Sequence, residues 1–195
     1  MPKKLIVYCH PYAGSFNHAI LEKVLGNLKS AGQEYLLIDL YQDQFNPSYT
    51  TEELSLFKTG ATCDPLVTKY QQMIRQADQI LLITPIWWND LPAMLKGFFD
   101  KVMKMTFAYQ VTKTGVKGLL DNISSLTIIT TATSPTWYLK YVCGNPIKKV
   151  FLGATVKQLG IKKRKWLSFG GVTKSTADQR TAMLKKLHIE KLFPS

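Results

Sequence analysis

The chain has 195 residues, which is long enough for one domain with a full hydrophobic core and short for two. Its apolar fraction of 46% and charged fraction of 19% argue against wholesale disorder. The formal net charge of +12 is unusual and favours anionic partners, namely nucleotides, nucleic acid or acidic lipid. We predict a single domain over residues 1–195.

The cysteine pattern and the hydropathy indicate the cellular compartment in which the protein works. Cys9, Cys63 and Cys143 are odd in number and far apart, with neither disulfide nor metal-site spacing, so reduced cytosolic thiols are the simplest interpretation. The N-terminal apolar run is much too short for a signal-peptide core, and no run approaches the roughly 20 apolar residues that span a bilayer. We expect a soluble, cytoplasmic protein with no metal centre and no membrane insertion.

The first 40 residues predict a strand, a helix and a second strand. Residues 5–9 are a compact apolar run, and residues 17–31 carry apolar side chains at helical spacing until Gly32 stops the helix. Residues 35–40 form the next predicted strand. This βαβ unit implies parallel strands joined by a right-handed crossover.

The rest of the chain continues the alternation. The polar stretch 42–64 contains a short helix near residues 52–57, and a loop of this length is usually functional or a minor insertion. Residues 107–120 are predicted as a second long connection. The other predicted strands are 79–83, 125–131 and 165–169, and the other predicted helices are 65–77, 92–102, 135–153 with a break near 144–146, and 176–192. Five strands and about five helices predict a doubly wound α/β fold.

Three loops follow the carboxyl ends of predicted strands, at residues 10–17, 85–90 and 130–135. In an open α/β sheet, ligands bind beyond those strand ends. The first loop runs into a helix N-terminus, where unpaired backbone N–H groups and the side chains of His10, Ser15 and Asn17 could hold a phosphate. Its alternative interpretation is that Ser15 or Asn17 simply caps the helix. Neither a Walker lysine motif nor G-x-G-x-x-G is present.

The second loop places Trp87 and Trp88 beside an Asn and an Asp, which is turn chemistry. Two adjacent indoles offer flat surfaces that suit a flat ligand. The alternative is that both tryptophans are ordinary interface or core aromatics.

Three motifs stand in order along the chain: His10 with Ser15-Phe16-Asn17, Pro-x-x-Trp with the segment through Val102, and Phe107-Ala108-Tyr109. In this order they resemble the flavodoxin-like NAD(P)H:quinone oxidoreductase family, which includes the mammalian DT-diaphorases and many shorter bacterial relatives. The resemblance covers nearly the whole chain, and residues 85–102 are its most specific segment. It implies a flavodoxin-like fold with a five-stranded parallel sheet and helices on both faces.

The resemblance also implies roles for particular residues. The phosphate of a flavin would be held at the first loop, the isoalloxazine ring at the second, and the pyrimidine edge of the flavin at the third. Tyr138 matches a family tyrosine near the reduced flavin, and Tyr109 one that covers the site of the partner subunit in a homodimer. The cofactor-binding residues implied are His10, Ser15, Phe16, Asn17, Pro85, Ile86, Trp87, Trp88, Asn89, Thr130, Thr131, Ala132 and Thr133.

The implied cofactor is FMN, with FAD as the alternative, and NAD(P)H is the co-substrate. The implied reaction is a two-electron, ping-pong reduction of a quinone or related acceptor, in which the chemistry belongs to the cofactor. Two departures from the family stand out. Thr-Thr-Ala-Thr replaces the usual Thr-Thr-Gly-Gly at residues 130–133, and a family histidine is missing near Gly144.

Three other functions share some of these features. A flavodoxin-type electron carrier would bind flavin without using NAD(P)H, but such carriers are usually acidic. A flavin-binding regulatory subunit, such as those of potassium-efflux systems, could use a basic face against a partner or lipid headgroups. Nucleic-acid binding through residues 162–165 with Lys140, Lys148 and Lys149 is disfavoured, because the tryptophan pair sits at another strand end than the cluster 162–165.

Overall fold

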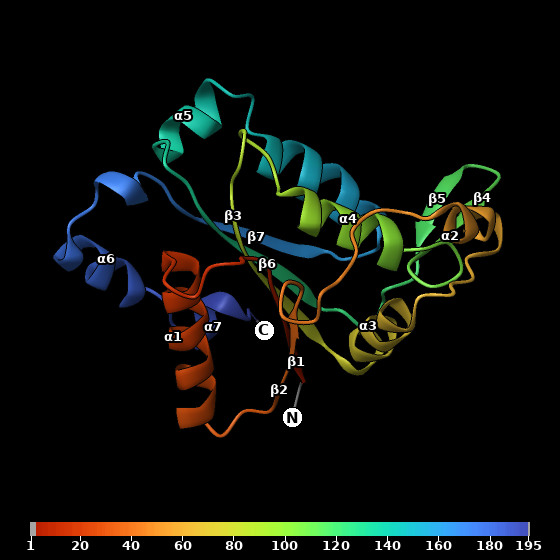
Figure 1. Ribbon diagram of the computed structural model, residues 1–195, viewed down its shortest axis with the longest axis horizontal. Coiled ribbons are helices and arrows are strands. Elements are labelled where there is room, and N and C mark those ends of the chain that lie inside the picture. Colours follow the sequence, from red (N-terminus) through yellow and green to blue (C-terminus); the bar gives the residue numbers. More distant parts are fainter. Residues whose placement is uncertain (1–2, 195) are drawn as a thin grey trace.

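A computed structural model describes residues 3–194, which fold around a five-stranded parallel sheet (Figure 1). The predicted doubly wound α/β architecture is confirmed, with strand order β2-β1-β3-β6-β7. The order changes direction between β1 and β3, which is where folds of this kind place their ligands. The strands are β1 Lys4–Tyr8, β2 Tyr35–Asp39, β3 Gln79–Pro85, β6 Ser125–Thr131 and β7 Lys163–Phe169.

Helices cover both faces of the sheet (Figure 1). One face packs against α1 (Phe16–Ser30), α6 (Ala177–Leu184) and α7 (Ile189–Leu192). The other packs against α3 (Pro65–Gln76), α4 (Ala93–Val102) and the π-helical segment η2 (Ile147–Val156). Because side chains alternate along a strand, neighbouring residues of β1 enter different cores: Leu5 joins one and Ile6 the other. Burial on both faces explains why the central strands read as continuous apolar runs.

The connection predicted over residues 107–120 is wrong, because it contains the hairpin β4 (Tyr109–Thr112) and β5 (Gly115–Gly118). The predicted helix 176–192 is also wrong in its middle, where the chain leaves the helix between α6 and α7. Asn27 Nδ2 donates to Leu187 O at 2.6 Å, so a carbonyl that a continuous helix would use is bonded to α1 instead. The remaining elements are α2 Thr51–Ser55, η1 Phe57–Thr59, α5 Thr136–Tyr141 and η3 Val172–Lys174.

The long segment 42–64 is fixed to α4 by a buried charge network. The Lys101 side chain is 1% exposed, and its Nζ lies 2.7 Å from Glu53 Oε1 and 3.0 Å from Asp64 Oδ2. The same ammonium donates hydrogen bonds to Asp64 Oδ2 and, at 2.9 Å, to Asn46 O, while its contact with Glu53 is an ion pair. Gly97 of α4 allows this close approach, since a Cβ there would lie 2.3 Å from Pro47 O. The segment therefore forms a fixed wall and not a free loop.

Candidate functional site

The first loop leads from β1 into the first turn of α1. Ser15 is the N-cap of the helix, and its Oγ accepts a hydrogen bond from His18 N at 3.1 Å. The capping role that the sequence left open for Ser15 is therefore present. The N–H groups of Phe16 and Asn17 have no hydrogen-bond partner within residues 3–194. With the helix dipole behind them, these two donors fit a phosphate.

His10 stands at the start of this loop and meets the second loop. Its ring packs edge to face on that of Trp87, with centroids 6.2 Å apart, and its Nδ1 accepts the N–H of Tyr12 at 3.1 Å. Burial lowers the pKa of His10 below its usual value. The imidazole is therefore neutral at pH 7, with its hydrogen on Nε2, and can donate one hydrogen bond to an oxygen of a ligand.

Asn17 is placed differently from what its predicted role suggested. Its side chain is buried and turned towards the sheet, where Nδ2 donates to Thr131 Oγ1 at 2.7 Å. Its Oδ1 is buried without a hydrogen-bond partner among the described residues. Asn17 thus offers a backbone donor to a phosphate and an unsatisfied side-chain acceptor beside it. The ring of Phe16 packs on Phe169 of β7, with centroids 6.0 Å apart, and supports the loop from behind.

The second loop begins where β3 ends, at Pro85, and turns back between Trp87 and Asp90. The backbones of these two residues exchange hydrogen bonds of 3.0 and 3.1 Å. Trp88 and Asn89 form the tip of the turn with φ angles of 51° and 65°, a left-handed conformation that is costly for a bulky residue. Trp88 is 99% exposed, so the interpretation of this residue as a core aromatic is wrong. An exposed indole on a strained turn is typical of a binding site.

The third loop follows β6, whose last two residues serve the scaffold. Thr130 Oγ1 accepts the indole N–H of Trp166 at 2.8 Å, while Thr131 accepts from Asn17. Both hydroxyl oxygens thus accept hydrogen bonds from within the fold. Ala132 and Thr133, which stand where the family usually has two glycines, both lack a positive φ angle. The departure therefore introduces no backbone strain.

The second and third loops enclose a cavity of about 280 Å³ together with the start of α5. Trp88, Asn89, Thr133 and Ser134 each have a backbone N–H without a partner in the described part of the chain. The cavity thus combines an aromatic wall with four unused donors, which is the composition of a site for a flat, polar-edged ligand. Its lining residues are Ile86, Trp88, Asn89, Ala132, Thr133, Ser134, Tyr138 and Leu139.

Six predicted residues line this cavity, and two of the lining residues were missed. Ser134 lies in the predicted third loop directly after Thr133, and Leu139 follows Tyr138 on α5, so proximity in sequence was the available signal. Tyr138 has no hydrogen-bond partner for its hydroxyl within residues 3–194; its ring meets Trp137 edge to face, with centroids 6.0 Å apart. No group of three or more His, Cys, Asp or Glu side chains in the described chain could hold a metal.

Tyr109 lies elsewhere, at the start of the β4–β5 hairpin. It lines a groove of about 550 Å³ whose other lining residues include Asp90, at the end of the tryptophan turn (residues 87–90), and Val116 of the hairpin. Phe57, Val116 and Val150 are large apolar side chains exposed along this groove. Within one chain, Tyr109 is not part of the cavity that Tyr138 lines.

The comparisons agree with this geometry. Residues 2–190 match the protein family described as having a flavodoxin-like fold. An uncharacterized NAD(P)H oxidoreductase of Haemophilus influenzae is 29% identical over 182 residues, which cover 93% of this chain and 90% of that protein. The crystal structure of Smu.1420 from Streptococcus mutans is 34% identical and superposes with a TM-score of 0.80, over 94% of this chain and 95% of that one.

An NAD(P)H:quinone oxidoreductase from Methanothermobacter marburgensis is 26% identical, with a TM-score of 0.85 over 95% of this chain and 94% of that chain. These matches span nearly the full lengths of the chains compared. The resemblance drawn from the motifs is confirmed, and the chain belongs to the flavodoxin-like fold family.

Proposed function

We propose that this protein is an FMN-dependent NAD(P)H:quinone oxidoreductase. The observation that carries the proposal is the cavity at the carboxyl ends of β3 and β6, which Trp88 and Tyr138 line together with residues whose backbone donors are unused. The Asn17–Thr131 hydrogen bond ties the loop after β6 to the N-terminus of α1, where two more donors are unused. The relatives named as an NAD(P)H oxidoreductase and an NAD(P)H:quinone oxidoreductase support the same reaction.

The residues present fit FMN. The N–H groups of Phe16 and Asn17, with His10 Nε2, would hold the phosphate. The buried Oδ1 of Asn17 lacks a donor, and a ribityl hydroxyl next to the phosphate would supply one. The tryptophan turn and the loop after β6 would hold the ring system from two sides. FAD would make the same contacts. We propose FMN because these contacts are enough to hold the whole of it.

When bound, FMN would accept two electrons and a proton from NAD(P)H and pass them to the acceptor. The chain contributes position and electrostatics. The N–H groups of Thr133 and Ser134 present the positive ends of backbone dipoles, which would stabilise negative charge that develops on the ring system. Trp88 and Tyr138 form flat walls against which a nicotinamide and a quinone can stack in turn, as a ping-pong sequence requires.

A homodimer would complete the site. The groove that contains Tyr109 is lined by exposed apolar side chains, which are typical of a protein–protein contact. A second copy bound there would bring its own Tyr109 towards the cavity of the first. We place this enzyme in the cytoplasm, since Cys9, Cys63 and Cys143 are free thiols and fit a reducing compartment.

The decisive experiment is a visible spectrum of the protein loaded with FMN, recorded without air before and after adding NADPH or NADH. Flavin bands that bleach on addition, and return when a quinone is added, are the expected result. Bound flavin that NAD(P)H does not bleach would favour an electron carrier or a regulatory subunit. Absence of flavin binding would overturn the assignment of all three loops.

A further inference from the structure

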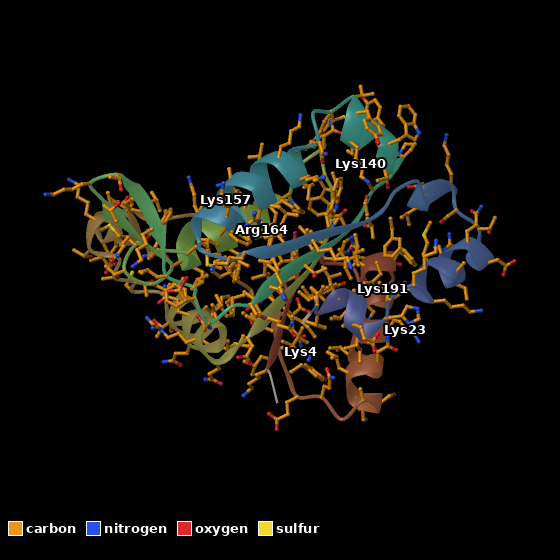
Figure 2. The ribbon with its side chains drawn as sticks, turned by 180° about the vertical axis from the view of Figure 1, so that it is seen from behind. Lys4, Lys23, Lys140, Lys157, Arg164 and Lys191 are labelled. Carbon is orange, nitrogen blue, oxygen red and sulfur yellow. The ribbon has the colours of Figure 1, made fainter. Side chains whose placement is uncertain are left out.

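The positive charge of the chain is concentrated in its last third. Residues 122–195 contain 13 of the 25 Lys and Arg residues but 2 of the 13 Asp and Glu residues, so the preceding 121 residues are close to neutral. The charged segment builds β7, α5, η2, α6 and α7. Figure 2 shows Lys140, Lys157, Arg164 and Lys191 distributed along this part of the molecule, where β7 is the edge strand. The electrostatic field is therefore strongly one-sided.

Several of these lysines have ammonium groups that make no interaction within the fold. Lys148 and Lys149 on η2, and Lys157 directly after it, are exposed and take part in no ion pair or hydrogen bond through their ammonium groups within residues 3–194. Lys140 of α5 differs, since its Nζ lies 5.6 Å from the ring centroid of Trp166. The lysines of η2 are thus available to an external anionic surface.

Helix α5 carries exposed aromatic side chains next to this charge. Trp137 is 59% exposed and Tyr141 is 82% exposed, four residues apart on one side of the helix, and Val142 continues the patch. Leu139 points the other way and is buried. We call Trp137, Tyr141 and Val142 the aromatic tip. Helix α5, which carries the two aromatic residues, lies beyond the end of the sheet (Figure 1). The aromatic tip lines neither the groove nor the cavity described above.

We propose that the aromatic tip and the lysines of η2 dock this protein onto the surface of an anionic lipid bilayer. Trp and Tyr favour the boundary between headgroups and acyl chains, where their rings are apolar and their polar ends stay wet. Lysines beside them gain from the negative potential of anionic lipid. Nucleic acid fits less well, because sequence-tolerant binding of single strands uses a basic groove with stacked aromatics, whereas this tip projects.

Docking in this way has a consequence for the proposed function. Tyr138 lies between the tip residues along α5 and lines the cavity. A bilayer in contact with the tip would therefore bring the cavity close to the depth at which lipid-soluble quinones reside. The docking itself needs no flavin, and only this consequence rests on the proposed function. No helix among the described residues is long and apolar enough to cross a membrane. The proposed contact is that of a protein lying on the bilayer surface.

The test is co-sedimentation of the full-length protein with vesicles at low ionic strength, in the absence of NAD(P)H. One set of vesicles contains equal parts phosphatidylglycerol and phosphatidylcholine, and the other phosphatidylcholine alone. We expect binding to the anionic vesicles, weakened by added salt. Each lysine lost in Lys148→Gln/Lys149→Gln should lower the partition coefficient about fivefold. Trp137→Ser/Tyr141→Ser should lower it as well.

Lys23→Gln/Lys29→Gln on α1 is the matched control, since it removes two exposed lysines away from the tip and should retain binding. Failure to bind anionic vesicles, equal binding to phosphatidylcholine alone, or an equal loss in the control would each overturn the proposal. Retardation of single-stranded nucleic acid by the protein, lost in Lys148→Gln/Lys149→Gln, would assign the face to nucleic acid instead. Because these measurements need no electron transfer, their failure leaves the proposed reaction untouched.

Discussion

Asn17 Nδ2 lies 2.7 Å from Thr131 Oγ1, so one hydrogen bond joins the first turn of α1 to the last residue of β6. The two residues are 114 positions apart in the chain and both are buried. Through this bond the helix terminus that fits a phosphate and the loop that lines the cavity hold a fixed relative position. The bond is made where water cannot replace it, so losing one partner leaves a buried amide unsatisfied.

Thr131→Val removes the acceptor while keeping the shape of the side chain. We expect the free energy of unfolding to fall by about 1–3 kcal/mol and the affinity for FMN to fall as well, because the two loops lose their tie. Thr127→Val is the matched control on the same strand: its Oγ1 is buried without a partner, so the change should be neutral or stabilising. Urea unfolding and FMN titration measure both effects. Equal losses in the two variants would show that the bond has no special role.

Trp88 is expected to matter for binding and not for folding. Its side chain is nearly fully exposed, so Trp88→Ala should change the free energy of unfolding by less than about 0.5 kcal/mol. The same variant should retain flavin more weakly, because the flat wall is lost. Tyr141→Ala, which also truncates an exposed aromatic, should retain flavin normally. Normal flavin affinity in Trp88→Ala would remove this residue from the site.

The backbone of Trp88 allows a second comparison. At a φ angle of 51° every residue but glycine is strained, so Trp88→Gly should be more stable than Trp88→Ala by about 1 kcal/mol. Both variants should lose flavin equally. Thermal unfolding of the two proteins side by side measures the difference, and a glycine variant that is less stable would contradict the strain.

The strands and most helices could be predicted because each buries an apolar pattern. The central strands lie between two helical layers, and their continuous apolar sequences reflect burial on both faces. The β4–β5 hairpin could not be predicted in this way, since residues such as Val111 and Val116 are exposed and leave no alternation. The break between α6 and α7 depends on Asn27, which is 160 residues away from Leu187 in sequence.

The candidate site, too, could be predicted only where short sequence motifs mark it. The tryptophan turn and Tyr138 followed from motifs, and the cavity contains them. The side chains of Asn17, Thr130 and Thr131 serve the scaffold, which no motif could reveal, because the face that each takes depends on the register of β6 against its neighbours. The φ angles of Ala132 and Thr133 likewise become clear only with the backbone in view.

The Lys101–Glu53 pair predicts a specific dependence of stability on pH. Burial by itself would raise the pKa of Glu53, but the Lys101 ammonium and hydrogen bonds from Thr50 outweigh burial and hold this pKa below its usual value. A carboxyl group whose pKa is lowered by folding stabilises the fold above its unfolded pKa of about 4.3, and the contribution is lost as the pH falls through the folded pKa. Lys101 has a raised pKa, with burial opposed by Glu53 and Asp64, so its contribution is present below about 10.4 and lost at higher pH.

Lys101→Met should therefore destabilise the protein by about 3–5 kcal/mol near neutral pH, because the buried carboxylate of Glu53 and the partly buried carboxylate of Asp64 lose their partner. Glu53→Gln should flatten the loss of stability between about pH 5 and the folded pKa. Asp100→Asn, which breaks the exposed pair with Lys96, should cost about 0–1 kcal/mol and leave the acid slope unchanged. Urea unfolding across this pH range measures all three. An unchanged slope in Glu53→Gln would show that other carboxylates control acid unfolding.

The groove that contains Tyr109 predicts how a dimer would support the reaction. Val116→Asp places a charge among the apolar side chains of the groove and should shift the protein to a monomer in light scattering, with a loss of quinone turnover. Tyr109→Ala should keep the dimer mass while lowering turnover, since the tyrosine would act on the partner's cavity. Val142→Asp puts the same charge on an exposed valine directly after α5 and should leave the mass unchanged. A wild-type protein that is monomeric and fully active would contradict the shared site, whereas a dimer that survives Val116→Asp would place the interface on another face.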